Sequence, residues 1–162
     1  MARTYTLNMA NATLANQAVT AAFVNVGTTC SLEFLRAWAS QSSSNNTAQQ
    51  RIQLSTQVSS FPTLTGATPA KNWLLDPASQ IVSGTAGAAG TCGVNASAEG
   101  AGAKSIIYPD AFSIVNGWLC VPTPAETWTL NAGAASGIGV HLPAAPGSLG
   151  NWNAGLTFRE MG

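Results

Sequence analysis

The chain has 162 residues, a formal net charge of zero and a content of charged residues of only 7%, against about 25% in ordinary soluble domains. A neutral chain with its lysines and arginines scattered singly is not expected to bind nucleic acid. No apolar run approaches the roughly 18 residues of a membrane span. The length suits one domain, 1–162, with a single core.

The shortage of charge has two interpretations. Uncharged polar side chains can solvate the surface, or much of the surface can be covered by other subunits, because the cores of interfaces are depleted in charge. We favour the second interpretation, since free monomers usually stay soluble through charged side chains.

Two strands are expected near the N-terminus. Residues 3–9 alternate, with Tyr5, Leu7 and Met9 on one face, which is typical of a half-buried strand. The run 19–26, VTAAFVNV, is apolar throughout and predicts a strand buried on both faces.

The next two apolar segments are expected to pair as a long hairpin. Residues 30–40 fit a helix or a strand by period, and the flanking Gly and Ser residues favour a strand. Residues 51–58 alternate, which places Ile52, Leu54 and Val58 inward. The same alternation predicts outward positions for Arg51, Gln53, Ser55 and Gln57.

Residues 61–105 differ in composition from the rest of the chain, being rich in Gly, Ala, Ser, Thr and Pro. A segment of this length is unusual for a loop inside a compact domain. We predict an extended excursion or arm within the domain, anchored by Trp73 and by residues 92–94.

The stretch 108–130, YPDAFSIVNGWLCVPTPAETWTL, is expected to lie at the centre of the fold. Asn116-Gly117 predicts a type I′ turn between two apolar strands. Pro122 and Pro124 then turn the chain, because proline cannot continue a central strand. Residues 137–142 and 156–159 are the last expected strands. Many short strands with frequent turns predict an all-β fold, a β-sandwich or a jelly-roll-like barrel.

The sequence contains no convincing catalytic, cofactor or metal motif. His141 is the only histidine, no G-x-S-x-G motif accompanies it, and we expect it to point to solvent or to a subunit contact. The three cysteines, Cys30, Cys92 and Cys120, have no metal-binding spacing and are expected to be small buried hydrophobic residues. The run GAGAKS at 100–105 lacks the glycine frame of a phosphate loop. We expect no enzyme, no cofactor and no metal.

The order of motifs resembles a family of small structural proteins of tailed-bacteriophage virions. The resemblance covers nearly the whole chain and rests on five places: 19–22 (VTAA), 39–42 (ASQS) with 51–54 (RIQL), 75–77 (LDP), 110–126 (DAF to WLCVPTPAE) and 156–160 (LTFRE). It implies a structural virion component, a capsid decoration or cement protein, and brings no catalytic residue with it.

The composition and the resemblance together predict a cement protein on the capsid surface, folded in the host cytoplasm and binding the major capsid protein and itself, as a trimer. The expected contacts come from the N-terminal strand, the excursion and a late loop, at Tyr5, Leu7, Trp73, Leu74, Leu75, Ile81, Val82 and Trp152. The alternative is a tail or fibre module that binds a glycan or receptor through Trp73 and Trp152, because exposed aromatic rings stack on sugars. A hydrolase that depends on His141 is the third hypothesis.

Overall fold

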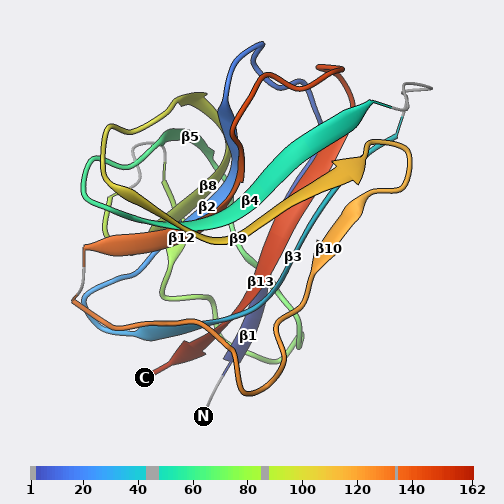
Figure 1. Cartoon of the computed structure of the whole chain (residues 1–162). Helices are drawn as coiled ribbons and strands as arrows, with labels where there is room; N and C mark the ends of the chain where they lie inside the picture. Colours follow the sequence, from blue (N-terminus) through green and yellow to red (C-terminus); the bar gives the residue numbers. More distant parts are fainter. Residues whose placement is uncertain (1–2, 43–47, 85–87, 134) are drawn as a thin grey trace.

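A computed structural model describes residues 3–42, 48–84, 88–133 and 135–162. The described residues form an all-β structure of two sheets (Figure 1). The strands are β1 Arg3–Ala12, β2 Val19–Asn25, β3 Ser31–Gln41, β4 Gln49–Val58, β5 Thr63–Gly66, β6 Ala70–Lys71, β7 Val82–Ser83, β8 Thr91–Ala98, β9 Lys104–Ser113, β10 Trp118–Cys120, β11 Thr129–Leu130, β12 Ser136–Leu142 and β13 Trp152–Met161.

The first sheet has the strand order β10-β3-β13-β1-β6, and β11 also pairs with β3. All its pairs are antiparallel. The C-terminal strand β13 lies in the middle, with Phe158 opposite Phe34 on one side and opposite Tyr5 on the other. The two ends of the chain are thus held together in one sheet.

The second sheet has the order β5-β8-β2-β12-β4-β9. It is antiparallel except for β7, which pairs with β8 in parallel. The expected strands at 3–9, 19–26, 30–40, 51–58, 137–142 and 156–159 all coincide with strands of the structure. The prediction of a β-sandwich is confirmed at the level of two sheets packed face to face.

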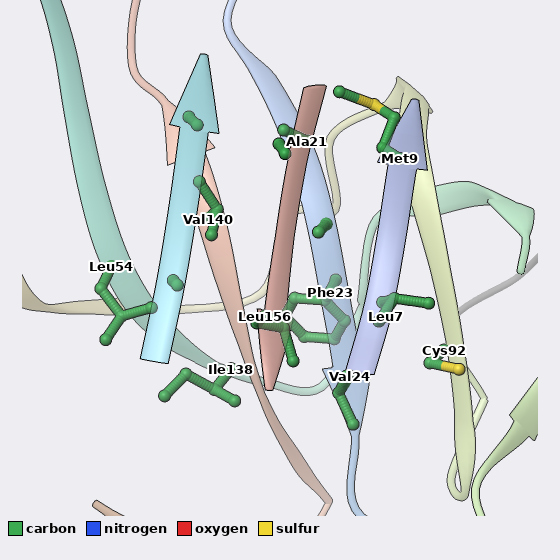
Figure 2. Close-up of a cluster of buried hydrophobic side chains, with 14 of the residues drawn as sticks. Leu7, Met9, Ala21, Phe23, Val24, Leu54, Cys92, Ile138, Val140 and Leu156 are labelled. Carbon is green, nitrogen blue, oxygen red and sulfur yellow. The ribbon is translucent and has the colours of Figure 1, made fainter. Parts of the chain in front are cut away.

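The core lies between the sheets, where β1 and β13 of the first sheet contact β2, β8 and β12 of the second. Figure 2 shows Leu7 and Leu156 from the first sheet meeting Val24, Ile138 and Val140 from the second. All five side chains are completely buried. The predicted inward faces of 3–9 and 137–142 are therefore confirmed, and β2 is buried on both faces as expected.

The outer face of the second sheet is covered as well, which explains why β2 and β12 are buried throughout. The Phe23 ring lies over Gly137 and Gly139, where a Cβ would come within 2.3 and 2.6 Å of ring atoms. Phe61 packs on Phe23 with its ring centroid 5.7 Å away. Side chains larger than glycine at these two positions of β12 would displace the ring.

Of the expected outward positions of β4, Arg51 is exposed, but the other three were wrong for the same reason. Gln53, Ser55 and Gln57 are buried on the covered outer face, whereas Val58 at the end of the strand is half exposed. Gln57 Nε2 donates to the carbonyl oxygen of Ser60 at 2.9 Å, which satisfies its amide under the covering segment. Alternation identified the two faces, but it did not reveal that the polar face is covered.

Both expected hairpins were wrong. β3 and β4 belong to different sheets, and so do β9 and β10. Gly117 has a positive φ of 72°, but the chain at this turn crosses from the second sheet to the first. Figure 1 shows β9 leading into β10 along the right side of the molecule. The stretch 108–130 therefore lies at an edge of the sandwich and not at its centre.

Candidate functional site

A groove opens at the edge of the sandwich where β9 and β10 are both edge strands. One wall is formed by Ile107 and Tyr108 of β9, and the other by residues 119–123 and 126–128. The groove has a volume of about 650 Å³. We call it the edge groove.

The edge groove presents apolar side chains beside polar ones, and the apolar ones are exposed because successive residues of β10 point to opposite sides. Trp118 and Cys120 are buried, whereas Leu119 and Val121 are 64% and 60% exposed. Trp128 packs on Phe34 at a ring-centroid distance of 5.5 Å and forms part of the groove lining. The walls thus combine exposed aliphatic side chains with an aromatic ring.

A hydrogen bond ties the two edge strands together. Trp118 Nε1 donates to Asp110 Oδ2 at 3.0 Å, and the other oxygen, Oδ1, accepts the backbone N–H of Ala111. Behind this link Phe112 meets Trp152 edge to face, with centroids 6.3 Å apart. The hydrogen bond fixes the separation of β9 from β10, and hence the width of the groove.

A second exposed apolar feature follows β6. Trp73, Leu74 and Leu75 are 65%, 87% and 84% exposed, and Val82 is 54% exposed. A turn closed by the Asp76 N–H and the Trp73 carbonyl oxygen, 3.0 Å apart, holds these three consecutive residues. We call residues 73–75 the apolar loop.

The apolar loop is fastened to the body on both sides. Before it, Lys71 pairs with Tyr5 in the β1–β6 ladder, and Thr6 Oγ1 donates to Asn72 Oδ1 at 2.7 Å. After it, the Tyr5 hydroxyl donates to the Pro77 carbonyl oxygen at 3.1 Å. A loop held at both ends presents its apolar side chains in a defined position.

The eight predicted contact residues divide into two groups. Trp73, Leu74, Leu75 and Val82 are exposed and available for contacts. The other four are completely or almost completely buried: Tyr5, Leu7, Ile81 and Trp152. For these four the prediction was wrong, because their side chains belong to the core: Tyr5 and Leu7 lie on the interior strand β1, Trp152 begins β13, and Ile81 lies just before β7.

Two tryptophans, Trp73 and Trp152, do not lie where the sequence analysis placed them. Trp73 was expected to anchor the excursion together with residues 92–94, but Trp73 is exposed, whereas Cys92 is buried as an anchor would be. Trp152 was expected in a loop, but it lies in β13, and its Nε1 donates to the Ser148 carbonyl oxygen at 2.6 Å. A buried indole cannot stack on a sugar.

His141 is buried, not exposed as expected, and lies in a polar cluster on the outer face of the second sheet. Glu99 accepts hydrogen bonds from the Thr20 N–H and hydroxyl at 2.5 and 2.8 Å and pairs with Lys104 at 2.5 Å. His141 Nδ1 lies 3.5 Å from Glu99 and 3.3 Å from Thr20 Oγ1. Burial lowers the pKa of His141, Lys104 lowers it further, and Glu99 opposes both.

This cluster does not have the arrangement of a catalytic triad. In a triad the carboxylate and the nucleophile bind opposite nitrogens of the imidazole. Here Glu99 and Thr20 both approach Nδ1, and the Thr20 hydroxyl donates directly to the carboxylate. The cluster is suited to fastening the segment around Glu99 to β2.

The cysteines and residues 100–105, the other candidates for a chemical role, pack against neighbouring parts of the chain. The three cysteines are buried and unpaired, and burial raises the pKa of Cys92 to about 12 and that of Cys120 to about 11. In the 100–105 run, Gly100 and Gly102 lie against the Ser59–Ser60 backbone, where a Cβ would come within 1.8 and 1.9 Å of a carbonyl oxygen. Across the described ranges, no group of three or more His, Cys, Asp or Glu side chains is placed to hold a metal ion.

The prediction from sequence missed the edge groove. The stretch 108–130, which forms most of it, was expected to lie at the centre of the sandwich and not at an edge. One signal was present in the sequence: the alternation at 118–121 has apolar residues in both registers. In a strand with one solvated face, the outward positions are normally polar.

Within the described part of the chain, no helix is long and apolar enough to span a membrane. In comparisons with known proteins, no family model, no curated protein and no solved structure matches this chain. The kinship with small phage virion proteins therefore stays a prediction.

Proposed function

We propose that this protein is a structural component of a bacteriophage virion, a capsid decoration (cement) protein that stabilises the head shell by binding the major capsid protein and other copies of itself. The exposed apolar loop carries this proposal. Three consecutive large apolar side chains, 65–87% exposed, stand on a chain in which 7% of residues are charged. Exposed apolar clusters on soluble proteins usually mark interaction sites.

The strand order supports a jelly-roll form of the sandwich. Eight strands form two facing sets, β1-β13-β3-β10 and β2-β12-β4-β9. Along the chain, consecutive strands of these eight alternate between the sets, except that β4 is followed by β9 in the same set, as in a double-sheet jelly roll. Jelly rolls are frequent in viral capsid proteins, although fold alone does not establish function.

The segment 61–105 is the proposed shell-binding excursion. It connects β4 to β9 and contributes β5, β7 and β8 to the β2 side of one sheet and β6 to the β1 side of the other. The apolar loop projects from this connection. We assign the contacts that cement the shell, with the major capsid protein or between copies of this chain, to the excursion and not to the N-terminal strand, because the apolar side chains of β1 are buried.

Particles without this protein test the proposal. Virions lacking it are expected to lose their DNA at lower temperature or under milder osmotic shock, and adding the purified protein is expected to restore their resistance. Leu75→Ser should weaken this restoration, whereas Val58→Ser, at a half-exposed residue outside the loop, should not. Equal heat and osmotic resistance with and without the protein would contradict the cement role.

The alternative, a tail or fibre module that binds a glycan, retains one observation in its favour. Trp73 is exposed and can stack on a sugar ring, whereas Trp152 cannot because it is buried. Glycan-array binding that Trp73→Ala abolishes and Trp152→Phe preserves would favour this alternative over the cement role.

A further inference from the structure

We propose that copies of this chain associate head to tail, with the apolar loop of one copy seated in the edge groove of the next. The inference rests on the self-association that the proposed function includes, and not on the binding to a shell. It names the two surfaces that meet and the kind of symmetry that relates them.

The two surfaces match in character. The apolar loop offers the side chains of Trp73, Leu74 and Leu75, all more than half exposed. The edge groove offers exposed aliphatic residues, Leu119 and Val121, beside the ring of Trp128. Its volume of about 650 Å³ lies within the range of about 300–1,000 Å³ typical of binding pockets, which is space for more than one side chain of the loop.

The charges beside the two surfaces are opposite in sign. Lys71 is exposed two residues before the loop, and Glu126 is exposed in the lining of the groove. Among the described residues, neither takes part in an ion pair within one chain. Asp76, at the far end of the loop, is half-buried. Docking would therefore bring the Lys71 ammonium towards the Glu126 carboxylate, which within the chain accepts a hydrogen bond from the Thr123 hydroxyl.

The positions of the two surfaces require a head-to-tail contact. The loop follows β6 and the groove lies beside β10, and these strands are the opposite edges of the first sheet. Four strand spacings separate them, roughly 19 Å. Different patches on opposite edges form a heterologous contact, which produces a ring where the rotation closes and a row of subunits where it does not.

Pairing of two β9 edges is the competing form of self-association. β9 is a ten-residue edge strand with Ile106 and Tyr108 exposed, and such edges are templates for strand addition. Pro109 lies within the strand, opposite Gln53 of β4. Proline within a sheet is confined to edge strands because it has no N–H to donate, and it blocks the continuous ladder that a second strand would need.

Sedimentation of the full chain over a range of concentrations tests the proposal. We expect wild type to form species larger than the monomer. Leu74→Ser on the loop and Val121→Ser in the groove should each weaken association about tenfold or more, as expected for removing a buried aliphatic side chain. Val58→Ser, another exposed apolar residue, is the matched control and should associate like wild type. A far-ultraviolet circular dichroism spectrum like that of wild type will show that each variant is folded, since weaker association can itself lower the temperature of unfolding.

Mixing the two variants decides between the modes of association. In a head-to-tail contact, Leu74→Ser keeps its groove and Val121→Ser keeps its loop, so the mixture should form a heterodimer that neither variant forms alone. Lys71→Glu and Glu126→Lys should likewise each weaken association and recover it when mixed. A monomeric wild type, a Val121→Ser protein that associates like wild type, or a mixture that stays monomeric would overturn the proposal. None of these results would decide the separate question of binding to the shell.

Discussion

The Glu160 carboxylate accepts the backbone N–H of Ile81 at 3.2 Å, although the two residues are 79 positions apart in the sequence. The same carboxylate accepts the Gln80 N–H and the Ser79 hydroxyl. Glu160 is only 3% exposed. One buried side chain of the last strand thus holds the segment that carries the apolar loop.

Glu160→Ala is expected to lower the free energy of unfolding by about 3 kcal/mol. It removes the carboxylate that accepts the Gln80 N–H and the Ser79 hydroxyl, and it leaves the Ile81 N–H with Ser79 Oγ alone. Urea denaturation measures this loss, and hydrogen exchange should show faster exchange of the amides of Gln80 and Ile81. Glu33→Ala is the control. Its partner Arg159 is 42% exposed, so loss of that ion pair should cost about 1 kcal/mol or less. Equal losses in the two variants would contradict the role given to Glu160.

Gly139→Ala is expected to destabilise the fold by about 1–3 kcal/mol, as overpacking does. The new methyl group would lie 2.6 Å from the Phe23 ring and 2.7 Å from the Ala22 carbonyl oxygen. Gly150→Ala is the matched control, because nothing lies within 4 Å of a Cβ there. Differential scanning calorimetry compares the two. A Gly139→Ala protein as stable as Gly150→Ala would show that the outer face is not tightly packed.

The stability of the protein is expected to fall as the pH rises from about 9 to about 12. Burial, assisted by the Glu160 carboxylate, raises the pKa of Cys92 from 9.0 to about 12. The folded state therefore keeps the thiol proton that the unfolded state loses, and the stabilisation is complete below pH 9 and lost above it. One such proton contributes a slope of about 1.4 kcal/mol per pH unit.

Cys92→Ala should make the alkaline loss of stability shallower. The slope of the free energy of unfolding against pH is the quantity to compare, since the missing sulfur also lowers stability at every pH. Cys120, whose pKa is about 11, adds to this slope over part of the same pH range. Its contribution to the slope should remain in the Cys92→Ala variant. A slope identical to wild type would contradict the protonated state of Cys92.

At acid pH we expect the protein to lose stability because of His141. Its pKa is lowered by burial and by Lys104, so the folded state disfavours the charged imidazole. The resulting stability is present above the unfolded pKa of 6.5 and is lost as the pH falls through the lower pKa of the folded state. His141→Asn should therefore lose less stability than wild type between pH 7 and pH 5. Urea unfolding at a series of pH values measures the difference, and parallel curves would contradict it.

Period and composition were sufficient to identify most strands. The alternation at 3–9 and the apolar run at 19–26 arise from local burial on one face or on both, and local burial is visible in the order of residues. The buried state of the three cysteines followed in the same way from their spacing and from the absence of metal motifs.

The sequence did not show which strands pair with one another or which sheet face is covered by another segment. β3 and β4 follow one another in the chain, and the hairpin expected between them was wrong because each finds its partners in a different sheet. The polar residues at 53, 55 and 57 were expected to be solvated, but Phe61 and the segment around Gly100 cover that face. Neither the partner of a strand nor the segment that covers it is recorded in the local pattern.

The sequence by itself determined the all-β class, the inward residues of the core strands and the shortage of charge, because each depends on residue type and local spacing. Only the tertiary structure decided which apolar residues remain on the surface. Tyr5 and Leu75 are both large, apolar residues near strand ends, yet one is completely buried and the other is 84% exposed. The difference arises from contacts made across the sheets by residues far apart in the chain.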